Sequence, residues 1–109
     1  MNKSEFSKML HEITDAVNEW ESSNSNKKKS ERLVYWPIAD EKIVASSEEY
    51  EKKRTYQISI FTTMPPDNST VVKKLKEIFE KNDILSTIYY EFNEKDRIFH
   101  TYTSLEVIE

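Results

Sequence analysis

The sequence has no cysteine and no glycine among its 109 residues. Without cysteine it can form no disulfide, no thiol nucleophile and no thiolate-bound zinc site. Without glycine it lacks the usual loops that hold phosphates and dinucleotides, which argues against a nucleotide-dependent enzyme. No apolar run approaches the roughly 18 residues of a membrane span, and the first ten residues lack the apolar core of a signal peptide. We expect a protein made in the cytosol that has no membrane partner.

Positive charge is also scarce, with 16 lysine and arginine residues against 20 acidic ones and a net charge of −4. Nucleic-acid binding needs concentrated positive charge, so we expect no specific binding of DNA or RNA. The one basic run, Lys27–Lys29, lies in "ESSNSNKKKSER" and is typical of a solvated loop. We predict a polar loop over residues 21–31 with no apolar residue that could pack. The length fits a single domain over residues 1–109.

Apolar residues at helical spacing predict two amphipathic helices. The first covers residues 4–20, with Ser4 as a candidate N-cap and an apolar face of Phe6, Met9, Leu10, Ile13, Ala16, Val17 and Trp20. The second begins near Val71, after the candidate caps Asp67, Asn68 and Ser69. It ends at Asn82-Asp83, where Asn82 can adopt the left-handed conformation that glycine usually supplies.

Strand patterns occupy most of the remaining chain. Residues 32–36 predict a short edge strand that Pro37 ends, and residues 54–63 alternate as a strand does. "STIYYEF" and "RIFHTYTSLEVI" around "NEKD" predict a terminal hairpin. Residues 38–54 have no regular period and are interpreted as a protruding arm or hairpin. The order α-β-β-β-α-β-β predicts an α+β two-layer domain, with helices packed on one face of a small, mostly antiparallel sheet.

The two histidines are the natural candidates for chemistry. His100 lies near Asp96 and Arg97, but the sequence matches no serine or cysteine nucleophile to it, so we expect a structural role. His11 lies beside Glu12, too far from His100 in the sequence to make a metal-ligand spacing. We therefore predict no catalytic residue, no metal site and no cofactor.

The aromatic triplet and a charged run are candidates for contact with other proteins. Tyr35-Trp36-Pro37 could be core packing, or an interface anchor of the kind tyrosine and tryptophan often provide. The run over residues 48–54 could be a solvated strand with weak ion pairs, or an arm that meets opposite charge on a neighbour. The candidate interface residues are Tyr35, Trp36, Pro37, Asp40, Glu48, Glu49, Tyr50, Glu51, Lys52, Lys53 and Arg54.

A longer pattern supports the second interpretation. "YWP…D…ASS..Y…K.TYQISIFTT.P", followed by an amphipathic helix and "DRIFHTYTSLEV", resembles the tail-terminator (tail-completion) family and related neck proteins of siphophages and their prophages. The resemblance covers most of the chain. Its matching elements are Tyr35-Trp36-Pro37, the strand from Tyr56 to Phe61, and Arg97 to His100 with Thr101 and Tyr102.

The resemblance implies a structural protein with no enzymatic activity. Members of the family form a hexameric ring on the end of the tail tube, stop its polymerisation and offer a surface to the head-side connector. Expected partners are further copies of the chain, the tail-tube protein and the head-completion connector. DNA would pass through the ring without specific binding. We expect the protein in the host cytoplasm before assembly and in the virion tail or neck afterwards.

The free subunit could be monomeric and form a ring only on its template, the tube end. Deletion of residues 40–50 is expected to leave a folded protein that no longer terminates tails. Two alternatives remain open. The chain could be a head–tail joining protein of the same gene module, or a small non-viral cytosolic binding or regulatory module.

Overall fold

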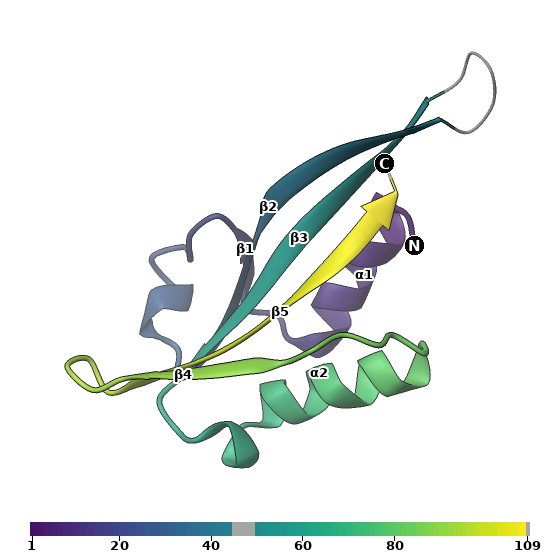
Figure 1. Ribbon diagram of the computed structural model, residues 1–109. Coiled ribbons are helices and arrows are strands. Elements are labelled where there is room, and N and C mark those ends of the chain that lie inside the picture. The colour runs from purple at the N-terminus through teal and green to yellow at the C-terminus, as the bar shows by residue number, and fades with distance from the viewer. Residues whose placement is uncertain (45–49, 109) are drawn as a thin grey trace.

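The computed structural model describes residues 1–44 and 50–108, which form an α+β domain with a sheet on one side and helices on the other (Figure 1). Two short 3-10 turns, η1 and η2, accompany the regular elements. The elements in chain order are α1 (Lys3–Ile13), β1 (Val17–Glu19), η1 (Asn26–Lys28), β2 (Glu31–Val44), β3 (Tyr50–Thr62), η2 (Pro66–Asn68), α2 (Thr70–Lys81), β4 (Tyr89–Asn93) and β5 (Ile98–Ile108). The predicted fold class and the order α-β-β-β-α-β-β are confirmed.

The five strands form one sheet in the order β1-β2-β3-β5-β4. β1 pairs with β2 in parallel, and the other neighbours are antiparallel. The buried faces of α1 and α2 close over the same apolar side chains of the sheet, so both helices cover one face. The core cluster comprises Phe6, Met9, Leu10, Ile13, Leu33, Tyr56, Ile58, Ile60, Val71, Val72, Leu75, Ile78, Phe79 and Val107.

The first helix is shorter than expected. It begins at Lys3, because the N-cap is Asn2, whose side chain accepts the Glu5 amide in a capping box. It ends at Ile13, and residues 17–19 form β1 beside β2. The expectation of a helix to residue 20 with Ser4 as its cap was wrong. Ala16 and Val17 continue the apolar spacing of the helix, but hydrogen bonds to a neighbouring strand decide their backbone conformation.

The polar segment after β1 is packed more closely than its composition indicated. Asn18 Oδ1 accepts hydrogen bonds from the side-chain amide of Asn26 at 2.7 Å and from the backbone of Ser23 at 3.0 Å. Ser22 and Asn26 are buried. The expectation that nothing in residues 21–31 packs was therefore wrong, because polar side chains here satisfy one another and fix the η1 turn.

The prediction that the strand ends at Pro37 was wrong, because β2 continues to Val44. Leu33 donates its amide to Ala16, and the carbonyl of Tyr35 accepts the Trp20 amide, so odd-numbered residues of β2 direct their backbone groups toward β1. Pro37 follows the same alternation, but β1 has already ended at Glu19. The missing N–H of Pro37 therefore faces an open edge, and pairing with β3 continues after an irregularity between Pro37 and Ala39.

The later elements agree closely with the patterns. Tyr56, Ile58, Ile60 and Thr62 are buried on one face of β3, and β4 and β5 form the predicted terminal hairpin. Ser69 is the N-cap of α2, and its side chain accepts the Val72 amide. At the end of α2, Asp83 has a φ of 55°, whereas Asn82 has a φ of −99°. Asp83 therefore adopts the left-handed conformation that was expected of Asn82.

Candidate functional site

A two-stranded arm extends from the sheet where β5 ends. The last pair between β3 and β5 is Lys53 with Ile108, but β2 and β3 remain paired as far as Val44 and Tyr50 (Figure 1). The segment predicted as an arm or hairpin, residues 38–54, consists of these strand ends and the intervening residues. Glu48 and Glu49 lie outside the described residues. Tyr50 and Glu51 belong to β3, but their side chains lie outside the described part of the structure.

Ion pairs connect the strands at the base of the arm. Arg54 binds the Asp40 carboxylate with both Nε, at 2.6 Å, and Nη2, at 3.2 Å. Lys53 lies between Glu106 at 2.9 Å and Glu41 at 3.5 Å. The hydrogen bond from Arg54 lowers the pKa of Asp40, and the hydrogen bond to Glu106 raises the pKa of Lys53. These pairs are solvent-exposed, so they orient the arm more than they stabilise the fold.

Two lysines lie opposite each other farther along the arm. Lys42 on β2 pairs in register with Lys52 on β3, and both side chains are exposed. No ion pair with either lysine occurs among the described residues. Like charges directly across a strand pair are destabilising. The charge of Lys52 also contributes, after Arg54, to the lowered pKa of Asp40.

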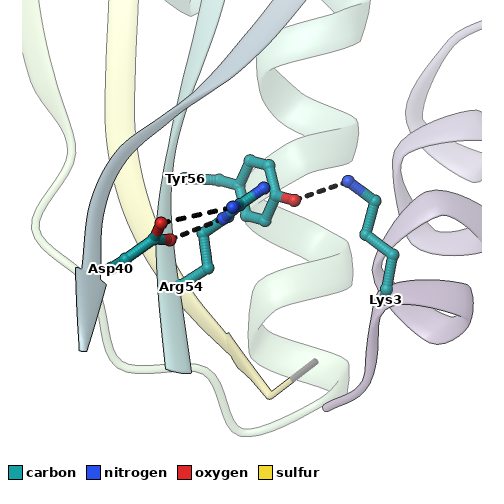
Figure 2. A network of polar contacts seen from close by, with 4 residues as sticks. All are labelled: Lys3, Asp40, Arg54 and Tyr56. Atoms are coloured by element: carbon teal, nitrogen blue, oxygen red, sulfur yellow. Dashed lines mark hydrogen bonds and ion pairs between the residues drawn. The ribbon is translucent and has the colours of Figure 1, made fainter. Parts of the chain in front are cut away.

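A second polar contact joins α1 to the sheet near the arm. Lys3 donates a hydrogen bond to the hydroxyl of Tyr56, and its ammonium also lies 4.3 Å from the centre of that ring (Figure 2). Burial lowers the pKa of Lys3, but the hydrogen bond to Tyr56 and the nearby acidic groups, including Glu19, outweigh burial and raise it. Lys3 therefore stays charged and ties the first turn of α1 to the central strand.

The aromatic triplet is divided between the two faces of β2. Tyr35 faces the helices and packs edge-on against Phe6, with ring centres 5.6 Å apart. Trp36, the next residue, points to the opposite face by strand alternation and is half-buried. Core packing therefore accounts for Tyr35. A role in an interface stays a prediction for Trp36 and Pro37, as it does for the charged residues of the arm.

The face of the sheet away from the helices carries a continuous row of stacked side chains. Phe61, His100 and Tyr102 stack in sequence across β3 and β5, with ring centres 4.6 and 4.7 Å apart. Tyr89 on β4 extends the row at 5.4 Å from Tyr102, and the guanidinium of Arg32 on β2 lies 4.6 Å from the Phe61 ring. The row crosses four strands, so it depends entirely on their register.

His100 in this row has partners that the sequence analysis did not assign to it. Its Nε2 lies 2.7 Å from the Ser59 hydroxyl, and its Nδ1 lies 3.5 Å from the Glu91 carboxylate. Asp96 instead bonds to Asn93 within the turn between β4 and β5. Burial lowers the pKa of His100, although Glu91 acts in the opposite direction. The sequence pattern matched no serine to this histidine, and the pairing of β3 with β5 supplies Ser59 as a hydrogen-bond partner.

Serine, histidine and glutamate in this order can transfer a proton, but Ser59 is poorly placed as a nucleophile. Its side chain is 0% exposed in the middle of the sheet, and its hydroxyl also takes a hydrogen bond from Gln57. A substrate carbonyl must reach the serine oxygen and find hydrogen-bond donors for its own oxygen. Around Ser59 the strand pairing already uses the backbone amides. Ser59 and Glu91 therefore fix the position of His100.

Residues 1–44 and 50–108 contain neither a metal-binding cluster nor a membrane-spanning helix. No group of three histidine, aspartate or glutamate side chains in this part of the chain is arranged to hold a metal ion. His11 contacts the carbonyl of Ser7 within its own helix, at 2.9 Å. No helix there is long and apolar enough to cross a membrane.

The signal for the stacked row was present in the sequence but needed the strand order. Alternation alone placed Ser59 and Phe61 on one face of their strand, and His100 and Tyr102 on one face of theirs. Only the registers Phe61–His100 and Ser59–Tyr102 show that these are the same face of one sheet. Arg32 is joined to them through the long pairing of β2 with β3.

No protein-family model matches the chain, and no curated protein matches it at a significant level of similarity. The interpretation of the site therefore depends on its residues and on the resemblance noted from the sequence.

Proposed function

We propose that this protein is a structural component of phage assembly, a tail terminator that forms a ring on the end of the tail tube. The ring stops polymerisation of the tube and joins the tail to the head-side connector. The sequence resemblance supports this proposal, and so does the α+β domain with an arm that leaves the sheet. The proposal includes no catalytic step and no cofactor.

The arm is the single observation on which the proposal depends most. Lys42 and Lys52 face each other with no ion pair to either among the described residues, and like charges across a strand pair are destabilising. An acidic surface on a neighbouring subunit or on the tail tube would reduce the repulsion between these two lysines on contact. The ion pairs of Asp40 with Arg54 and of Lys53 with Glu106 hold the base of the arm in a defined direction.

A closed ring also needs a second, different surface on each subunit, because its contacts are heterologous. β4 is the edge strand at the other side of the sheet and carries Tyr89, Tyr90 and Phe92, each about half exposed. An exposed edge strand with aromatic side chains is a common site for association with another chain. The arm and the β4 edge are thus suitable as the two surfaces of a ring contact.

The test is to add the purified protein to polymerising tail-tube protein and to image the products. Tubes of bounded length with a ring at one end are expected. The double variant Lys42→Glu, Lys52→Glu should bind the tube end at least tenfold more weakly, because it reverses the charge that an acidic partner would meet. Its matched control is Lys73→Glu, Lys81→Glu, on the exposed side of α2.

Unrestricted tube growth with the unmodified protein would refute the terminator. Binding to the connector under the same conditions, with no effect on the tube, would instead identify a head–tail joining protein of the same module. A non-viral binding module is the remaining alternative, and it predicts no ring with either component. An equal loss of tube-end binding in both double variants would mean that the arm does not contact the tube.

A further inference from the structure

Arg32 lies on the open face of the sheet, paired in register with Phe61 of β3. Its guanidinium lies over the Phe61 ring and donates one hydrogen bond, to the hydroxyl of Ser22 at 3.2 Å. No carboxylate contacts it within residues 1–44 and 50–108. Arg32 is also half-buried, and burial lowers its pKa. A guanidinium held in place and partly removed from water, with no anion beside it, is suited to bind one.

The lysine run of the sequence lies next to this arginine. Lys27, Lys28 and Lys29 belong to the η1 turn and its cap, which the contacts of Asn26 with Asn18 hold against β1. With Arg32, Phe61 and Ile98 these lysines line a depression of about 220 Å³. The fold therefore presents the three lysines beside Arg32 instead of leaving them in a loose loop.

A larger depression, of about 570 Å³, adjoins the first and shares Arg32, Phe61 and Ile98 with it. Two carboxylates also line it, but both already have donors. Glu91 accepts the Tyr102 hydroxyl and contacts His100, and Asp96 accepts the side-chain amide of Asn93. Across the two depressions Arg32 and the three lysines still outnumber these two carboxylates. Arg32 lies beside the apolar side chains of Phe61 and Ile98.

We propose that these two depressions form a docking site for an acidic, extended segment of a partner protein. A carboxylate of the segment binds Arg32 between Phe61 and the lysine turn, and an apolar neighbour packs against Ile98. The positive charge of Arg32 and the lysines selects an acidic residue of the segment, and the apolar lining selects an apolar residue next to it. This site lies on the open face of the sheet and does not involve Lys42 and Lys52 of the arm, so it stands independently of the tail-terminator proposal.

A nucleic acid fits this surface less well than a peptide. The aromatic rings of the row stack on one another, with angles of 12° between Phe61 and His100 and 29° between His100 and Tyr102. Both faces of the Phe61, His100 and Tyr102 rings are therefore covered by Arg32, by one another or by Tyr89, and cannot stack on bases. Glu91 and Asp96 would also repel a phosphate backbone that continued along the sheet from Arg32, whereas a peptide can place an uncharged residue beside these two carboxylates.

The test is a titration of the isotope-labelled full chain, followed by NMR, with a ten-residue peptide of alternating glutamate and leucine. Saturable shifts are expected at the amides around Arg32, Phe61 and Ile98. A glutamine–leucine peptide should bind at least tenfold more weakly, because it lacks the carboxylates. Arg32→Gln should reduce the affinity for the acidic peptide by roughly tenfold or more, while Lys73→Gln on α2 should leave it unchanged.

A triple variant, Lys27→Gln, Lys28→Gln, Lys29→Gln, covers the case in which Arg32→Gln fails to fold, because all three side chains are exposed. It should weaken binding of the acidic peptide at least threefold and reduce the salt dependence of binding. The proposal would be overturned if the acidic peptide caused no saturable shift, or if Lys73→Gln lowered the affinity for this peptide as much as Arg32→Gln. Tighter binding of a 20-nucleotide single-stranded DNA that also depends on Arg32 would replace it with a nucleic-acid site.

Discussion

The carboxylate of Glu31, the first residue of β2, accepts a hydrogen bond of 2.6 Å from the hydroxyl of Ser69, the N-cap of α2. The same carboxylate accepts the Thr70 hydroxyl at 3.0 Å, and Ser69 in turn accepts the Val72 amide. One acidic side chain thus joins the start of a strand to the positive end of a helix that lies 38 residues farther along the chain.

Glu31→Gln should lower the free energy of unfolding by about 1 kcal/mol at pH 7, because it removes the charge from a partly exposed set of hydrogen bonds. Burial raises the pKa of Glu31, but the hydrogen bonds from Ser69, Thr70 and Val71 outweigh burial and lower it below the ordinary 4.5. The stabilisation is therefore present above pH 4.5 and is lost as the pH falls through the folded-state pKa.

Urea unfolding at several pH values measures this effect. The variant should lose less stability than the unmodified chain on going from pH 5 to pH 3. Parallel curves at every pH would show that the charge of Glu31 does not contribute to stability.

Phe6 tests the packing of α1 on the sheet. Its side chain is 0% exposed and stacks on Tyr56 with ring centres 4.8 Å apart. Phe6→Ala should reduce the free energy of unfolding by about 3–5 kcal/mol, which is a large part of the stability of a domain of this size. Leu85→Ala is the matched control, because Leu85 is 100% exposed and should cost less than about 0.5 kcal/mol. Similar thermal midpoints for the two variants would contradict the placement of Phe6.

Trp20 tests the backbone strain of a chain that contains no glycine. Its φ of 70° is unfavourable for a bulky residue, and its side chain is 63% exposed. Trp20→Gly should be more stable than Trp20→Ala by about 1 kcal/mol, because glycine alone carries no Cβ at this position. Chemical denaturation of the pair isolates the backbone effect, since both variants lack the indole. An alanine variant as stable as the glycine variant would show that residue 20 is not strained.

His100 should make the domain sensitive to mild acid. Burial lowers its pKa below the ordinary 6.5, so the unfolded chain binds the proton more readily than the folded one. Stability is then complete above about pH 6.5 and falls as the pH drops below that value. His100→Gln should flatten the decline of the thermal midpoint between pH 7.5 and pH 5.5, a range above the ordinary pKa of the carboxylates.

The control for this pH effect is His11→Gln, because His11 is exposed on α1 and should leave the slope unchanged. A midpoint that rises on acidification in the unmodified chain would mean that Glu91 dominates and that the charged form of His100 is favoured in the fold.

The sequence by itself determined those helices, strands and turns whose apolar pattern involves only residues close together in the chain. The alternation in β3, the apolar face of α2 and the turn between β4 and β5 each follow from side chains that are neighbours in the chain. Together with the order of the elements they were sufficient for the α+β class. The sequence also indicated an arm or hairpin over residues 38–54, because the apolar residues there follow no regular period.

Where a local pattern is compatible with two conformations, only the tertiary structure decided which one the segment adopts. Residues 17–20 suit a helix by spacing, but pairing with β2 makes them a strand and places Trp20 in a strained turn. A proline in a central strand would end it, because a ladder hydrogen bond is lost, whereas a proline whose missing N–H faces an open edge is tolerated. Only the short length of β1 shows that Pro37 faces an open edge. The row from Arg32 to Tyr89 and the contacts of His100 depend on the registers of four strands. Register is set by the packing of the whole sheet, because no single strand contains the information to fix it.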